Sequence, residues 1–380
     1  MSDMNGRLRQ FYAERNKLFQ LHLDLLYACD LDCHHCYLDN KSRPQVGRER
    51  IVEILEQAAE LGAMNLLCSG GEIFLRRDLM DILREARRLR FNIRLKTHGG
   101  NITREHALAL RELAVSKVDF SVYALDEDVH DAFTKKQGSL QSTLRGIQHL
   151  VDVGIAVEVR CSVTHFNAEH YRKLYEHFRS REIPATFNAR IRGTNSLTTN
   201  TYSLNLDYEE KVQLEMYRLE AHGGPAQRRR APAPEKSSFC FAGRTTVYVA
   251  PDLKVYPCTA FPIECGDLNQ QSLRAIWEQS PQLHTVRGAT RADTGICGTC
   301  AARAHCSYCP GTAYIESQGD WSRPPQLICN DAFAKLEAEE RFLAGKKARP
   351  HRSQKPRTHF PILNNLKAEA PQPENSNLRA

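Results

Sequence analysis

The sequence predicts an α/β fold, a partial (β/α)6 barrel of the TIM type followed by a small loop-rich domain. Three observations support this prediction. Between Leu21 and Gly193, short apolar runs alternate with amphipathic helical stretches, as in parallel strand and helix units. Gly and Asn residues separate these segments. Beyond residue 237 the chain becomes rich in Cys, Gly and polar residues, which is typical of a loop-rich domain.

The predicted elements follow one another along the first half of the chain. The first strand, in FQLHLDLL, leads into a cysteine-rich loop. The helix in RERIVEILEQAAELG has one apolar face, made of Ile51, Ile54, Leu55, Ala58 and Leu61. Gly62 ends this helix. Five more strands are predicted in MNLLCS, NIRLKTHG, KVDFSVYA, AVEVRCSVT and ATFNARIRG, with helices between them. Since barrels of this type place their chemistry at the C-terminal ends of the strands, we expect the site at that rim.

Length and composition predict two domains with extensions. A chain of 380 residues exceeds one average domain. Asp207 and Glu210 form a capping-box pattern that opens a helix between the domains. We expect an N-terminal extension at 1–20, the barrel at 21–205, a helix and linker at 206–237, the cysteine-rich domain at 238–335, and a helix end with a basic disordered tail at 336–380.

The charge and the termini exclude several classes of protein. The N-terminal segment has no apolar stretch of a secretion signal, and no run is long enough to span a membrane, so a cytoplasmic protein is predicted. The net charge is +7, and residues 341–380 carry nine basic against two acidic residues. The excess charge therefore lies in the tail rather than on the fold. We expect no membrane partner and no nucleic-acid partner.

The 13 cysteines fall mainly into two groups. Thiols of a cytosolic protein stay reduced, and clustered thiols are then more often metal ligands or catalysts than disulfides. Three of them lie near the start, and seven of the eight between residues 240 and 329 form the second group. Cys68 and Cys161 lie in apolar, strand-like runs and are predicted to be buried and inert. Cys265 fits neither group clearly.

The first group has the spacing Cys29-x3-Cys33-x2-Cys36. Four thiolates would complete a [4Fe–4S] cluster, whereas three leave one iron open to a reacting group. Three thiolates on one loop therefore favour an iron–sulfur cluster with an open position. A zinc site completed by His34 or His35 is the alternative, although structural zinc sites usually draw paired ligands from two segments.

Several segments around this loop resemble the radical S-adenosylmethionine (SAM) enzymes. The three cysteines followed by Tyr37 are similar to the cluster loop of that family. CSGGE, with Ser69 to Glu72, resembles the family's second-strand motif. LKTHGG resembles the third-strand motif, although His98 stands where the family more often has Asn. FSVYALDEDVHDAFT with GSLQSTLRGIQHL resembles the fourth strand and the helix after it.

The resemblance implies a [4Fe–4S] cluster on the three-cysteine loop, with SAM bound to its open iron. Reduction would cleave SAM and form a 5′-deoxyadenosyl radical that abstracts hydrogen from a substrate. Gly70 and Gly71 would allow close backbone approach, and Glu72 would receive the methionine ammonium. Ser121 would reach the ribose. The residues that the resemblance places at SAM are Tyr37, Ser69, Gly70, Gly71, Glu72, Thr97 and Ser121. No acid, base or nucleophile is expected beyond the cluster ligands.

The late cysteines, with the strand-turn-strand before them, resemble the SPASM domain, which carries one or two auxiliary [4Fe–4S] clusters. The resemblance assigns Cys297, Cys300, Cys306 and Cys329 to one cluster, and Cys240, Cys258 and Cys309 to the other. Two zinc knuckles with the same spacing are the alternative. The sequence departs from the pattern at Leu253, where Gly is usual, and at Ser307 and Tyr308, where three residues are usual. The first auxiliary cluster is therefore expected to be distorted, three-coordinate, completed by Cys265 or another group, or absent.

The resemblance implies a radical SAM oxidoreductase that crosslinks or desaturates a ribosomally made peptide. A separate leader-binding protein and an external electron donor would be its other partners. The alternatives are a maturase of a tetrapyrrole or other cofactor precursor, or of a sulfatase. An iron–sulfur or zinc scaffold without catalysis is the alternative from another class, but it does not account for the motifs at Ser69–Glu72 and Ser121.

Overall fold

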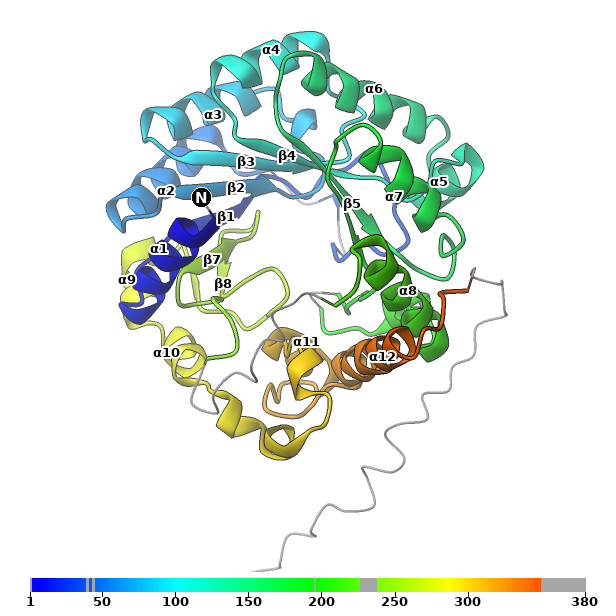
Figure 1. The fold of residues 1–380 in the computed structure, drawn as a ribbon. Coiled ribbons are helices and arrows are strands. Elements are labelled where there is room, and N and C mark those ends of the chain that lie inside the picture. Colours follow the sequence, from blue (N-terminus) through cyan, green and yellow to red (C-terminus); the bar gives the residue numbers. More distant parts are fainter. Residues whose placement is uncertain (1, 39–40, 43–44, 195, 226–237, 350–380) are drawn as a thin grey trace, which may run out of the picture.

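The fold was analysed in a computed structural model, which describes residues 2–38, 41–42, 45–194, 196–225 and 238–349. Its strands form an arc with helices on the outer side (Figure 1). All six predicted strands are present, in the predicted order. They are β1 (Gln20–Asp24), β2 (Asn65–Ser69), β3 (Asn92–Thr97), β4 (Lys117–Ser121), β5 (Val157–Ser162) and β6 (Ala185–Asn188). The partial barrel is confirmed.

The helices of the barrel follow the strands as predicted. They are α2 (Arg48–Glu60), α3 (Leu79–Arg88), α4 (Arg104–Glu112), α5 (Glu127–Thr134), α6 (Ser139–Asp152) and α7 (Tyr171–Arg179), with short 3-10 turns at η1 (Ile73–Leu75) and η2 (Asn200–Leu204). The apolar face of α2 is buried in the main hydrophobic core, except that Leu61 is half-buried at its end. Gly62 follows with φ 92°, a conformation that suits glycine at a helix end.

The cysteine-rich region continues the same sheet. Its strands are β7 (Thr246–Val249), β8 (Lys254–Tyr256) and β9 (Gly266–Asp267), and the strand order is β6-β5-β4-β3-β2-β1-β7-β8-β9. β7 runs parallel to β1, with His22 opposite Tyr248. The sequence did not reveal this pairing, because it joins segments more than 200 residues apart. The pairing covers the open edge of β1 and fixes the second region against the barrel.

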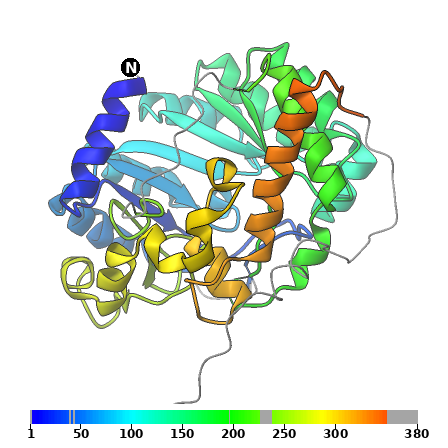
Figure 2. The ribbon, with the colours of Figure 1, turned by 60° about the horizontal axis from the view of Figure 1, so that its bottom comes forward.

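The remaining helices run from beside α2 round to the open side of the barrel opposite β2 and β3 (Figures 1 and 2). They are α9 (Leu273–Gln279), α10 (Pro281–Gly288), α11 (Pro310–Glu316) and α12 (Gln326–Leu343), with 3-10 segments η3 (Arg291–Thr299) and η4 (Arg303–His305). α12 extends across the predicted division at residue 335. The predicted basic tail from residue 350 on, and the linker at 226–237, lie outside the described residues.

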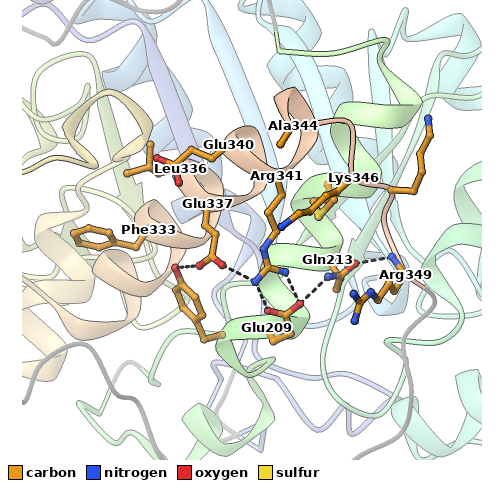
Figure 3. Close-up of a pocket in the computed structure, with 13 residues that line it drawn as sticks. Glu209, Gln213, Phe333, Leu336, Glu337, Glu340, Arg341, Ala344, Lys346 and Arg349 are labelled. Carbon is orange, nitrogen blue, oxygen red and sulfur yellow. Dashed lines mark hydrogen bonds and ion pairs between the residues drawn. The ribbon is translucent and has the colours of Figure 1, made fainter.

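Helices α8 (Tyr208–Ala221) and α12 pack against each other and join the two regions. A small apolar cluster of Val212, Met216, Ala334 and Ala338 lies between them. Arg341 binds the carboxylates of Glu209 and Glu337 at 2.5–2.8 Å on the wall of a pocket there (Figure 3). None of the predicted site residues lines this pocket.

An N-terminal helix, α1 (Ser2–Glu14), occupies the segment that the sequence left as an extension. Trp277 donates its indole N–H to the carbonyl of Asn16 at 3.0 Å, so the end of this segment is attached to α9. Among the described residues, none of the helices combines the length and the apolar character needed to cross a membrane.

The capping box that opens α8 is confirmed. The backbone N–H of Glu210 donates to the Asp207 carboxylate at 2.8 Å, and the N–H of Asp207 donates to Glu210 at 2.8 Å. Replacing Asp207 with Ala should lower the free energy of unfolding by about 1 kcal/mol, because a helix-end donor loses its acceptor. Asp207→Asn keeps an acceptor oxygen and should cost much less. Denaturant unfolding of both variants tests this, and equal losses would contradict it.

Candidate functional site

The loop after β1 holds Cys29, Cys33 and Cys36, all partly exposed. The backbone N–H of Leu31 donates to Cys29 Sγ at 3.4 Å, and the N–H of Cys36 donates to the Cys33 carbonyl at 3.1 Å. Burial, together with the negative charges of Cys36 and Cys29, raises the pKa of the Cys33 thiol to about 12. These thiols are therefore protonated at neutral pH unless a bound cation stabilises their thiolates. The donor set therefore fits an iron–sulfur cluster.

Two aspartates of this loop attach it to the barrel. Asp30 accepts from His98 Nε2 at 2.8 Å and from Lys136 Nζ at 2.6 Å. Asp32 accepts from Lys135 and Lys41, both at 2.9 Å, and these bonds lower the pKa of its carboxyl to about 2. The cysteine loop is thus held from β3 and from the end of α5.

The Gly70–Gly71 segment lies directly against the start of the cysteine loop. The N–H of Gly71 donates to the Leu26 carbonyl at 2.8 Å, and the N–H of Glu72 donates to the Ala28 carbonyl at 2.9 Å. A Cβ atom on Gly71 would lie 2.0 Å from the Ala28 oxygen, and one on Gly70 would lie 2.5 Å from the Leu26 oxygen. Only glycine leaves room for this contact. The expected close backbone approach is present, and it is made to the cysteine loop.

The Glu72 carboxylate is completely buried at the end of β2. It accepts from the Thr97 hydroxyl at 2.7 Å, and from the backbone N–H groups of Phe74 and His98, both at 3.0 Å. The His98 ring also lies 3.1 Å from it. His98 therefore links Glu72 to Asp30 of the cysteine loop, which explains a residue whose role the sequence left open. The Thr97 hydroxyl is therefore bound to the Glu72 carboxylate.

Asp24, which the sequence analysis missed, joins β1 to three other segments. This buried carboxylate accepts from the hydroxyls of Tyr37 at 3.0 Å and Tyr248 at 2.8 Å, and from Ser69. Burial alone would raise its pKa, but the neighbouring His22 and the hydroxyls of Ser69 and Tyr248 lower it. Two of the predicted SAM residues, Tyr37 and Ser69, thus share one acceptor. An acidic residue inside the apolar run FQLHLDLL was the available signal.

The barrel interior carries charged side chains from β3 to β5. Residues on a strand alternate between faces, so Arg94 and Lys96 point opposite to the buried core residues of β3. Arg94 binds Asp119 at 2.8 Å, and Arg160 binds Glu158 at 2.9 Å. Lys96 makes no hydrogen bond to any described residue. Burial lowers the pKa of its ammonium, and the charges of Asp119 and Asp24 act in the opposite direction.

Ser121 is the last residue of β4 and is half-buried. The hydroxyl of Tyr123, two residues later, interacts with both Ser121 and Cys33. Ser121 thus lies at the C-terminal rim, close to the cysteine loop, as expected from its position in the sequence. The structure places Thr97, Glu72 and Ser121 at the ends of neighbouring strands.

The late cysteines form two separate groups. The charges of Cys309 and Cys240 act on Cys258, and together with burial they raise the pKa of its thiol to about 12. Likewise, Cys297, Cys306 and Cys300 act on Cys329. Cys265 is buried, with its Sγ 3.5 Å from the Ile263 carbonyl. Cys258 is thus near Cys240 and Cys309, and Cys329 is near Cys297, Cys300 and Cys306, while the charge of Cys258 also acts on Cys265.

The surroundings of Cys297, Cys300, Cys306 and Cys329 suit an anionic ligand. The Nε atom of Arg291 is buried and has no hydrogen-bond partner among the described residues, and its charge acts on Cys297 and Cys306. A buried, unpaired guanidinium N–H is costly unless an acceptor is bound. The donor set of four thiols with this cation fits an anionic iron–sulfur cluster.

Both departures from the SPASM pattern have a structural explanation. Leu253, which stands where Gly is usual, takes a φ of 68° in the turn between β7 and β8. It therefore adopts the backbone conformation that glycine favours. Tyr308, in the shortened spacing, is buried, stacks on Phe239 and donates to the Trp321 carbonyl at 2.7 Å.

Comparison with known proteins agrees with this arrangement. The model of the radical SAM superfamily matches residues 24–178, and the model of an iron-sulfur cluster-binding domain, SPASM, matches residues 240–302. The chain combines a radical SAM domain with a SPASM domain. The radical SAM domain implies a [4Fe–4S] cluster with SAM, and the SPASM domain implies auxiliary iron–sulfur clusters.

Three similar proteins span this radical SAM and SPASM chain to different extents. The AdoMet-dependent heme synthase of Oleidesulfovibrio alaskensis is 23% identical, over 83% of this chain and 87% of the relative. The antilisterial bacteriocin subtilosin biosynthesis protein AlbA of Bacillus subtilis is 27% identical, over 69% and 60%. Streptococcus suis SuiB bound to its precursor peptide SuiA has a TM-score of 0.62 at 17% identity, over 81% and 76%. The last likeness concerns the fold.

The contact of Gly71 with Ala28 gives a direct prediction. Gly71→Ala should prevent the radical SAM loop from closing, because the added methyl group meets backbone that cannot move aside. Reconstituted protein should then contain about four fewer irons per chain, the content of one [4Fe–4S] cluster. Gly288→Ala is the matched control, since nothing lies within 4 Å of its Cβ position. Full iron content in Gly71→Ala would contradict the prediction.

Proposed function

We propose that this protein cleaves SAM reductively at Cys29, Cys33 and Cys36 and oxidatively modifies a ribosomally made peptide. The observation that carries the proposal is the close backbone contact of Gly70 and Gly71 with the start of the three-cysteine loop, which holds this loop at the strand ends. When bound, the cluster and SAM supply a 5′-deoxyadenosyl radical. The task of the chain is to bind and orient the reactants and to exclude water from them.

The residues proposed to surround SAM lie at the rim of the barrel, in the loop after β1 and at the ends of β2, β3 and β4. They are Tyr37, Ser69, Gly70, Gly71, Glu72, Thr97 and Ser121. The oxygens of Glu72 already accept several hydrogen bonds. What Glu72 offers to a methionine ammonium is therefore its buried negative charge. His98 and Thr97 hold that charge in place.

The barrel interior gives the substrate a chemical character. Lys96 has no ion-pair partner among the described residues, whereas Arg94 and Arg160 form ion pairs with Asp119 and Glu158. An unpaired ammonium inside a barrel attracts a carboxylate. We propose that Lys96 binds a carboxylate of the substrate. Acidic peptide side chains and the C-terminus of a peptide supply such a group.

A peptide substrate is supported by two likenesses, neither of which establishes it. AlbA, similar over 69% of this chain, is a bacteriocin biosynthesis protein, and SuiB shares the fold and binds a precursor peptide. The proposed ligands of the auxiliary clusters are Cys240, Cys258 and Cys309, and Cys297, Cys300, Cys306 and Cys329. Auxiliary clusters suit a reaction in which a substrate radical loses an electron to give a closed-shell product.

A tetrapyrrole precursor is the second candidate substrate. Two heme synthases are similar over 83% and 78% of this chain and over 87% and 92% of their own lengths. These alignments extend further than the alignment with AlbA. A tetrapyrrole with carboxylate side chains would also meet the cation that Lys96 provides. The substrate test must therefore include both classes.

The proposed function predicts a defined change of mass. Incubation of reconstituted protein with SAM, dithionite and candidate acidic peptides should give a product lighter by about 2 Da per modification, because two hydrogens are removed. Mass spectrometry of the peptide measures this loss. Parallel reactions contain an iron porphyrin with propionate side chains. Turnover of the porphyrin alone would overturn the peptide proposal and establish the second candidate.

The Lys96→Gln variant provides the control for the substrate contact. It should lower the yield of modified substrate at least tenfold, equivalent to about 1.4 kcal/mol of transition-state stabilisation. Release of 5′-deoxyadenosine without substrate should remain, because Lys96 is not among the residues proposed to hold SAM. If the variant lost this release as well, Lys96 would contact SAM rather than the substrate.

A further inference from the structure

Helix α1 lies against the first auxiliary cysteine group, although the sequence places the two more than 220 residues apart. The guanidinium of Arg9 stacks on the ring of Phe241, with its Cζ atom 4.1 Å from the ring centre. Phe241 directly follows Cys240, whose negative charge acts on Arg9. The helix therefore brings a permanent positive charge to the edge of this cysteine group.

Contacts at the end of α1 fix this position. Arg244 donates through Nη2 to the carbonyl of Ala13 at 3.3 Å, and through Nη1 to the carbonyl of Arg287 at 2.7 Å. The indole N–H of Trp277 reaches the carbonyl of Asn16. The helix thus docks on the cysteine-rich region at its end as well as through Arg9.

Arg9 and Arg244 each have a donor with no acceptor. Their Nε atoms are buried and make no hydrogen bond to any described residue. The charge of Cys240 acts on both side chains. Two buried, unpaired guanidinium N–H groups at one thiol indicate an acceptor that carries negative charge, as the sulfur atoms of an iron–sulfur cluster do.

We propose that Arg9, with Arg244, sets the reduction potential of the auxiliary cluster held by Cys240, Cys258 and Cys309, an inference that rests on the proposed function of these cysteines. Reduction adds one electron and no proton, so the reduced cluster is more negative by one charge. A nearby guanidinium stabilises that state, and hydrogen bonds to the sulfur atoms act in the same direction. Helix α1 would thereby raise the reduction potential of this cluster.

The test measures potential rather than turnover. The full chain carries Cys29→Ala, Cys33→Ala and Cys36→Ala, so that only auxiliary clusters remain, and it is titrated with dithionite while EPR spectra are recorded. Adding Arg9→Gln should shift the reduction equilibrium of one cluster about tenfold toward the oxidised state, which is 59 mV for a one-electron couple. Arg9→Lys keeps the charge and should restore part of the potential.

Arg15→Gln is the matched control, because Arg15 is exposed just after α1 and lies 3.7 Å from the Glu14 carboxylate. It should leave both potentials unchanged. An unchanged potential in Arg9→Gln would overturn the inference, as would loss of the signal in both Arg9 variants but not in Arg15→Gln, which would mean that Arg9 only holds the fold. Absence of any auxiliary signal before Arg9 is changed would instead contradict the proposed cysteine roles.

Discussion

The rest of the site depends on the close contact between Gly70–Gly71 and the backbone of residues 26–28. This contact brings the end of β2 against the start of the cysteine loop, and a side chain at Gly71 would leave no room for it. Two backbone hydrogen bonds then set the direction of the loop. Because Glu72 follows directly, its buried carboxylate, Thr97 and His98 take positions around the same loop. The steric requirement of two glycines therefore organises the whole rim.

The second constraint is a set of hydrogen bonds that share one acceptor, the carboxylate of Asp24. The Asp24 carboxylate accepts hydrogen bonds from the hydroxyl groups of Tyr37 in the cysteine loop, Ser69 in β2 and Tyr248 in β7. One buried carboxylate thus joins the radical SAM loop to a strand of the SPASM region. Pairing of β7 with β1 fixes the same connection through the backbone. The strand β7 of the cysteine-rich region therefore has a defined position relative to the three-cysteine loop.

Local patterns predicted the barrel because its strands and helices are specified by nearby residues. The face of α2, the capping box at Asp207 and all six strands were visible in this way. The grouping of the late cysteines followed from family resemblance, and it stays a prediction. Pairings between distant segments could not be predicted: β7 against β1, and Arg9 beside Cys240, depend on the completed fold. The role of His98 was equally hidden, because its partners Glu72 and Asp30 lie on other strand ends and loops.

The central claim is that the loop with Cys29, Cys33 and Cys36 binds the cluster that cleaves SAM. The most direct measurement is release of 5′-deoxyadenosine and methionine from SAM by anaerobically reconstituted, dithionite-reduced protein. The native chain should release both products. The variant with all three cysteines replaced by Ala should release neither, while it keeps the iron bound by the later cysteines. Continued release of 5′-deoxyadenosine by that variant would contradict the account.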